Sequence, residues 1–90
     1  MATASYDFEG MREQAGKVTK GAEDLRTLIT TIDGVVRDMA TAWSDPAQKK
    51  FEEQWTEMSA KLKEYVPVIE EYGKAVNAHA NKIEQAGAGI

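Results

Sequence analysis

Two runs of apolar residues, each with steps of alternately three and four positions, constrain the fold of this chain more than any other feature. One run extends from Met11 to Trp43 and the other from Phe51 to Ala86. Such spacing lines side chains along one face of an α-helix in a heptad repeat. The sequence therefore predicts an all-α chain with two long antiparallel helices, at about 8–42 and 46–86.

These runs also predict which residues form the core of a helical bundle. The predicted core residues come from the middle of both runs: Leu25, Ile29, Ile32, Val36, Met39, Phe51, Trp55, Met58, Leu62, Tyr65 and Ile69. A flanking row of Gly21, Leu28, Val35 and Ala42 widens the first apolar stripe. Beside the second run lies a row of mostly small residues, Ser59, Val66, Gly73 and Ala80, which predicts an interface or a packing groove.

The heptad phase breaks between Trp43 and Phe51, where Pro46 also lies. Asp45 is a good N-cap, Pro46 suits the first helical turn, and Gln48 stands where the partner in a capping box would. We therefore expect a hairpin bend at Trp43, Ser44, Asp45 and Pro46.

A three-helix bundle, broken near Gly34 or Pro67, is the alternative topology. Glycine weakens a helix interior, and Pro67 predicts a kink one turn earlier. The heptad phase nevertheless passes through both positions, whereas a turn would reset it. The hairpin is therefore the favoured topology.

A hairpin of two helices, each about 50 Å long, is too thin to enclose such wide apolar stripes. We expect it to pair with a second, similar hairpin in a four-helix bundle. Both a homodimer and a heterodimer fit this pattern. The 90 residues then form a single domain, 1–90, with frayed ends at 1–5 and 87–90.

The composition of the chain argues against several classes of function. The net charge of −4, without a basic stripe, argues against nucleic-acid binding. The absence of cysteine removes thiolate sites, and the lone His79 is expected to be a partly buried packing residue rather than a metal ligand. Without a convergent acid, base and nucleophile, we expect no enzyme, no cofactor and no metal.

The hydropathy of the sequence bears on membrane insertion and on the route of export. No apolar run approaches the length of about 20 residues that crosses a bilayer, so we expect no stable membrane insertion. The segment 1–13 lacks the hydrophobic stretch of a signal peptide. We therefore do not expect export through the Sec pathway. A third hypothesis is an amphipathic protein that binds membrane surfaces, but the net negative charge argues against it.

The bend reads Trp43-Ser44-Asp45-Pro46-Ala47, with Phe51 eight residues after the tryptophan. Together with the chain length and the two heptad seams, it resembles the WXG family of small helical hairpins, the early-secreted-antigen type exported by type VII secretion systems. The resemblance covers the whole chain. One departure is that Asp45 stands where the family has glycine.

A second departure concerns the C-terminal Tyr-x-x-x-Asp/Glu signal of many relatives. Here Tyr65 is followed four positions on by Ile69, and Tyr72 by Val76. Ala80 to Glu84 is only a degenerate version of the looser signal.

The resemblance implies a non-enzymatic effector or carrier, secreted without a Sec signal peptide after a cytoplasmic stage. It implies recognition by the secretion ATPase through the segment 81–90, with Trp43, Ala80 and Glu84 as candidate recognition residues. The alternative is a cytoplasmic adaptor or chaperone that pairs with a helical toxin and guides it to the exporter.

Overall fold

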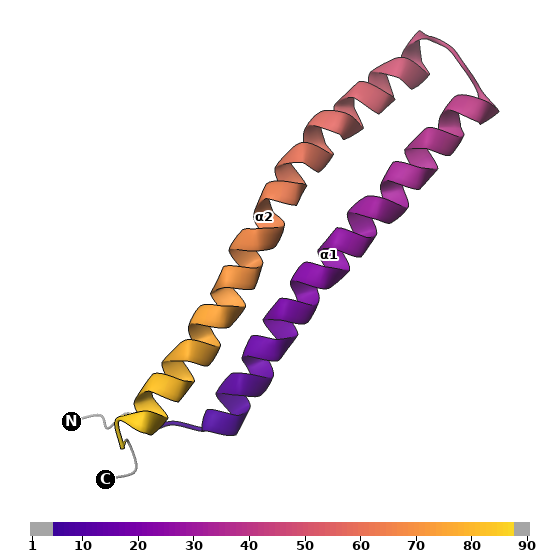
Figure 1. The fold of residues 1–90 in the computed structure, drawn as a ribbon. Helices are drawn as coiled ribbons and strands as arrows, with labels where there is room; N and C mark the ends of the chain where they lie inside the picture. Colours follow the sequence, from indigo (N-terminus) through magenta and orange to yellow (C-terminus); the bar gives the residue numbers. More distant parts are fainter. Residues whose placement is uncertain (1–4, 88–90) are drawn as a thin grey trace.

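The protein is an antiparallel hairpin of two helices, described by a computed structural model for residues 5–87. Helix α1 (Phe8–Ala42) has 35 residues and helix α2 (Pro46–Gln85) has 40. Figure 1 shows them side by side along their whole length, joined by the short segment 43–45. The predicted all-α hairpin is confirmed, with helix bounds that differ from the expected ones by one residue at the end of α2.

An aspartate caps the start of each helix. Oδ1 of Asp7 accepts a hydrogen bond from the backbone N–H of Gly10 at 2.9 Å, and Oδ1 of Asp45 accepts one from Gln48 at 2.8 Å. Pro46 occupies the first turn of α2, where its missing N–H has no helical partner to lose. The cap predicted at the bend is therefore confirmed. The Gln48 side chain, however, donates to Glu52 at 3.0 Å instead of closing a capping box.

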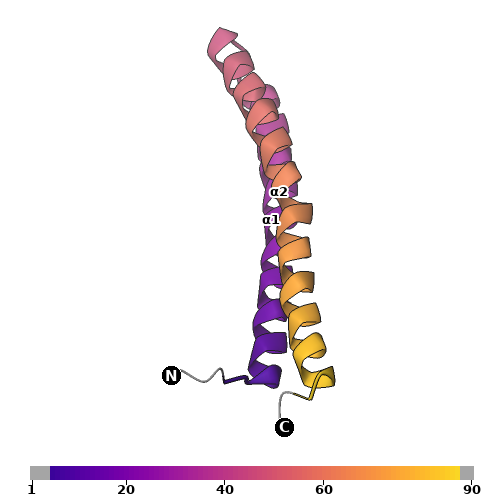
Figure 2. The same ribbon diagram turned by 90° about the vertical axis from the view of Figure 1, so that its left-hand side faces the viewer.

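Both helices run without interruption through the positions where a third helix was considered. Gly34 lies inside α1 and Pro67 inside α2. In Figure 2 the two helices curve gently together, so the bend in α2 is not a local break. The three-helix alternative is wrong for this chain, because the unbroken heptad phase prevails over the local cost of glycine and proline.

Helix α2 ends at a glycine. Gly87 has a positive φ of 76° and donates its N–H to the Glu84 carbonyl at 3.1 Å, which is the usual role of glycine after a helix C-cap. Gly87 thus terminates the helix. The rest of the predicted frayed ends, apart from Ser5, lies outside the described residues.

The helices pack through small side chains that recur every seven residues. Ala15, Ala22 and Ile29 of α1 are buried against α2, and the row of mostly small residues on α2 (Ser59, Val66, Gly73 and Ala80) is buried against α1. Leu25, Trp55, Leu62 and Ile69 pack beside Ala22, Ile29 and Val66. The small row predicted as an interface or groove therefore receives α1.

Most of the predicted core residues are not enclosed by the hairpin. Only Ile29 is buried, whereas Phe51, Met58 and Tyr65 are each more than half exposed. Phe51, Met58 and Tyr65 point away because α2 turns its small residues toward α1, which lets the helices approach closely, whereas Trp55, Leu62 and Ile69 of the same seam pack beside the contact. The heptad spacing alone did not distinguish these two rows.

The single-layer hairpin leaves an unusually large surface in contact with solvent. Its extents are 68 × 20 × 19 Å and its radius of gyration is 20.3 Å, against about 12 Å for a compact domain of this length. Its accessible surface of 6958 Å² exceeds the roughly 5,200 Å² typical of a folded monomer of this mass. Among residues 5–87, no large side chain is fully buried.

Candidate protein-interaction surface

Within residues 5–87, seven large hydrophobic side chains are at least half exposed, and all of them except Val68 form the main candidate site, which we call the apolar face. Leu28 and Val35 belong to α1, and the others lie on α2: Phe51, Met58, Tyr65 and Tyr72. Their exposed fractions range from 50% at Val35 to 63% at Tyr72. Within each helix they recur every seven residues, so each set forms one row along its helix.

Both rows lie on the same side of the hairpin. Leu28 immediately precedes the buried Ile29 on α1, and Tyr65 immediately precedes the buried Val66 on α2. The two helices are antiparallel and face each other. For this reason, the residue just before a buried contact residue lies on the same side of the hairpin in both helices. The two rows therefore form one continuous apolar surface.

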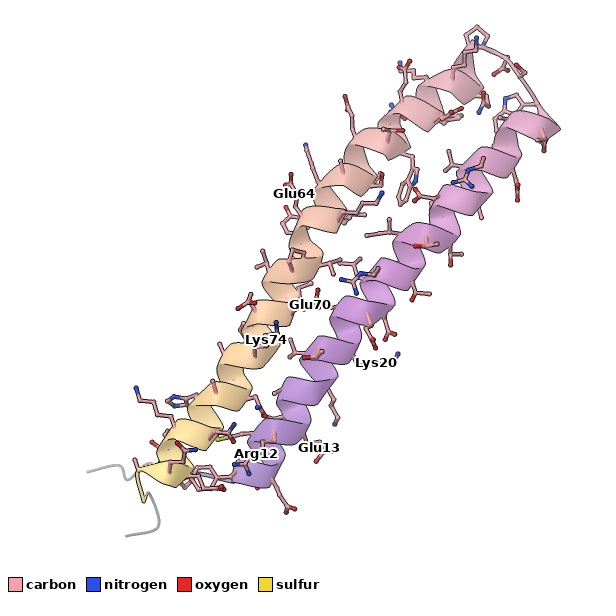
Figure 3. All side chains as sticks on the ribbon, viewed as in Figure 1. Arg12, Glu13, Lys20, Glu64, Glu70 and Lys74 are labelled. Atoms are coloured by element: carbon pink, nitrogen blue, oxygen red, sulfur yellow. The ribbon has the colours of Figure 1, made fainter. Side chains whose placement is uncertain are left out.

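Polar contacts between the helices occupy the opposite side, which we call the polar face. Residues of this face lie four positions after a buried contact residue, as Arg26 does after Ala22 on α1 and Glu70 does after Val66 on α2. Figure 3 shows Arg12 and Glu70 between the two helices. Three ion pairs cross from helix to helix here: Arg12–Glu84 at 2.9 Å, Arg26–Glu70 at 3.0 Å and Asp33–Lys63 at 3.9 Å.

These cross-helix contacts give the polar face its own partners within the chain. Arg12 also donates to Oδ1 of Asn81, at 2.9 and 3.0 Å. Ion pairs this exposed add little stability, but the side chains in them are already neutralised and solvated. The apolar face has no comparable partner within the hairpin, so it is the side that calls for a binding partner.

Two of the surface grooves of the hairpin are large. One groove of about 600 Å³ lies along the polar face beside Arg12, Thr19 and Asn77, and another of about 700 Å³ lies near the turn beside Gln48 and Glu52. Both are wide open and lack histidine. Within residues 5–87, no cluster of three or more histidine and acidic side chains could hold a metal ion.

One exposed side chain on α1 has a shifted acid–base equilibrium. On the outside of α1, Lys20 donates to Asp24, and this hydrogen bond raises the pKa of the Lys20 amine. The pair is exposed and links two turns of one helix. It therefore contributes to neither face.

The turn presents an aromatic ring at one end of the rod. Trp43 is 40% exposed, and its Nε1–H donates to Oδ1 of Asp45 at 3.0 Å. Its backbone N–H donates to the Met39 carbonyl, also at 3.0 Å. The four predicted turn residues, Trp43, Ser44, Asp45 and Pro46, are all exposed.

Comparison with protein families agrees with this architecture. Residues 3–88 match the family model WXG100, described as proteins of 100 residues with WXG. The chain belongs to the WXG100 family. The resemblance inferred from the turn and the heptad seams is confirmed.

Individual relatives of this WXG100 protein are distant in sequence and close in fold. It is 22% identical over 85 residues to the type VII secretion system extracellular protein A of Staphylococcus aureus strain USA300, covering 94% of this chain and 88% of that protein. The crystal structure of the secreted protein EsxB from Bacillus anthracis strain Sterne has a TM-score of 0.81 at 20% identity, with 96% of this chain and 98% of that one covered. A wild-type crystal form of EsxB gives a TM-score of 0.79 at 20% identity, over 93% and 97% of the chains.

The candidate recognition residues do not form a single site in this WXG100 protein. Trp43 lies at the turn, whereas Glu84 lies near the end of α2, where it pairs with Arg12 at the far end of the rod (Arg12 is labelled in Figure 3). Ala80 is completely buried against α1. Of the three, Trp43 is the one with a large apolar surface open to a partner.

The structure adds residues that the sequence patterns did not single out. Leu28 and Val35, which the sequence predicts only as a flanking row, form the α1 part of the apolar face, and Asp33 accepts the Trp55 indole N–H at 2.6 Å. His79 is exposed and continues the outer row of α2, so the expected partial burial is wrong for the single hairpin. The contrast between large and small rows on α2 was the sequence signal for this outward face.

Proposed function

We propose that this WXG100 protein is a non-enzymatic substrate of a type VII secretion system, an effector or carrier that acts as a four-helix bundle dimer. The apolar face carries the proposal. It joins residues from both helices into one apolar surface on a hairpin that has no second layer to cover it. The secreted relatives in Staphylococcus aureus and Bacillus anthracis support the route of export.

The amount of exposed surface fits a pairing partner. The excess over a compact monomer is about 1,800 Å² for one chain, roughly twice the 800 Å² that each partner buries in a standard protein interface. Aromatic side chains and methionine are enriched at such interfaces, and this face has Phe51, Met58, Tyr65 and Tyr72. A matching hairpin would cover it along its length.

The partner in this proposal is a similar helical hairpin, either a second copy or another chain of the same family. The secretion ATPase is the second partner, and the segment 81–90 and Trp43 are the regions proposed for its recognition. The protein would reach the outside through the type VII secretion system. Within the described residues, neither helix contains an apolar stretch long enough to cross a membrane.

A cytoplasmic adaptor or chaperone is the alternative function, and one sequence observation favours it. The positions four residues after Tyr65 and Tyr72 are apolar, Ile69 and Val76, so the acidic half of the export signal is missing at both places. Such an adaptor would use the same apolar face to pair with a helical toxin, and would remain in the cell.

An export experiment separates these functions. Culture supernatants and cell fractions are compared between strains with an active and an inactivated type VII ATPase. The wild-type chain is expected in the supernatant only when the ATPase is active. If it stays in the cells with an active exporter while its partner is secreted, the adaptor function is correct instead.

Two substitutions test the role of the apolar face in the same assay. Tyr65→Asp places a charge where a partner would bury it, at a side chain that the hairpin itself leaves 55% exposed. Asn77→Asp makes the matched change at an exposed position on the polar face. We expect Tyr65→Asp to be lost from the supernatant and Asn77→Asp to be exported normally. Equal export of both variants would contradict the proposal.

A further inference from the structure

The indole of Trp43 is held by a hydrogen bond that the turn itself supplies. Its Nε1–H donates to Oδ1 of Asp45 at 3.0 Å. The main chain is also fixed here, because Trp43 has an extended backbone (φ −154°, ψ 154°) and donates its N–H to Met39. Both the ring and the backbone of Trp43 are thus tied to the neighbouring helix ends.

The acceptor of this bond is ordered for an independent reason. The same Oδ1 of Asp45 accepts the Gln48 backbone N–H at 2.8 Å, as the N-cap of α2. A carboxylate at this place is also stabilised by the positive end of the helix dipole. Because the cap already orders Asp45, binding the indole requires little additional loss of side-chain entropy.

The hydrogen bond decides which part of the ring is available to another protein. An indole has one N–H donor and no acceptor, and here the donor is already used. The ring is still 40% exposed, and the surface that it offers is aromatic carbon. A glycine, which the family tripeptide has at the place of Asp45, has no side chain with which to form either bond.

We propose that Asp45 is a positioning residue for Trp43. It fixes the orientation of the exposed ring and leaves its aromatic carbon, rather than its N–H, for contact with an apolar group of the secretion machinery. This inference rests on the proposed function, because that function assigns a recognition role to Trp43. In this chain the third residue of the tripeptide therefore acts through its side chain.

Two conservative variants separate positioning from capping. Asp45→Asn keeps an oxygen at the same distance from the backbone, so it retains both hydrogen bonds. Asp45→Ser retains a good N-cap, but its hydroxyl lies one atom closer to the backbone and does not reach the indole while capping the helix. Both variants are expected to keep the helical circular dichroism of the wild type.

Hydrogen exchange of the indole N–H, measured by NMR on the full chain, is the direct readout. Trp43→Phe assigns the two indole signals, and Trp55 serves as an internal reference because its N–H donates to Asp33. Asp45→Ser should speed exchange at Trp43 by about tenfold and leave Trp55 unchanged, whereas Asp45→Asn should stay near the wild type. Unchanged exchange at Trp43 in Asp45→Ser would overturn the positioning role.

Export of the same variants tests the consequence for recognition. We expect Asp45→Ser to be secreted less than the wild type and Asp45→Asn to be secreted normally. Full secretion of a folded Asp45→Ser chain would overturn the role in recognition. If the wild-type chain itself is not exported, the proposed function fails, and indole exchange still decides whether Asp45 positions Trp43.

Discussion

At Gly73 the two helices come closer than a residue with a side chain would allow. A Cβ atom there would lie 2.6 Å from Oγ1 of Thr19 and 3.1 Å from the carbonyl oxygen of Ala15. The Thr19 hydroxyl also donates to that carbonyl at 3.1 Å, so neither group is free to move. Gly73 is therefore required by packing, in contrast to glycines of α1 that face open space.

Replacing Gly73 by alanine should lower the free energy of unfolding by about 1–3 kcal/mol, because the helices must separate locally. Gly16→Ala is the matched control, since a Cβ at Gly16 meets no atom within 4 Å. This control should raise stability by up to about 1 kcal/mol through helix propensity. Urea unfolding at one fixed protein concentration measures both. Equal effects of the two substitutions would show that Gly73 is not a close-contact position.

The residue scale is also where sequence reasoning reached its limit. The heptad spacing identified the apolar side chains of α2, yet two neighbouring rows share that spacing. Met58 and Tyr65 are predicted as core of the paired bundle, which stays a prediction, and within the hairpin the contact with α1 is made by Ser59 and Val66. The distance between helix axes decided between them, and this distance depends on residues of α1 that are far away in the sequence.

The two helices themselves could be predicted almost completely. The two long apolar repeats, the break in heptad phase between them and the Asp45-Pro46 helix start are local properties of the chain. They suffice to place the bend. Asp7 caps α1 in the same way, but it lies before the apolar repeat begins. Helix ends with clear cap chemistry can thus be predicted from the sequence, and so can the row of small residues on α2 that packs against α1.

Pro67 allows a test of helix continuity. It lies inside α2, is exposed, and lacks the N–H that would bond one turn back. Pro67→Ala should restore this bond and raise the free energy of unfolding by about 1–2 kcal/mol, less than the full cost of a helical proline because the unfolded chain also gains freedom. Chemical unfolding followed by circular dichroism gives the value. A loss of stability would mean that the proline ring contributes packing that the continuous helix does not explain.

The whole molecule is a rod with two unlike sides. Ion pairs such as Arg26–Glu70 join the helices on the polar face, and the opposite side exposes Leu28, Val35 and the outer row of α2. An extended chain of this length could be predicted to need a partner, because two helices enclose no interior of their own. The identity of the partner is not encoded in the periodicity, since any hairpin with a similar stripe would match it.

Pairing through the apolar face also connects the fold to secretion. A covered apolar face would leave the turn with Trp43 and the polar face at the surface of the bundle, open to other proteins. In the proposed function, assembly takes place on one side of the rod and recognition at its end.

Light scattering coupled to size-exclusion chromatography, performed on the purified chain at micromolar concentration, tests the central claim most directly. If the partner is a second copy, the mass should be twice that of the 9.9 kDa chain and the sample should be helical. If the partner is another chain, the protein alone should be unfolded or aggregated, and should become a helical complex when that chain is added. A helical, monodisperse monomer of 9.9 kDa would contradict the claim that the apolar face must be covered.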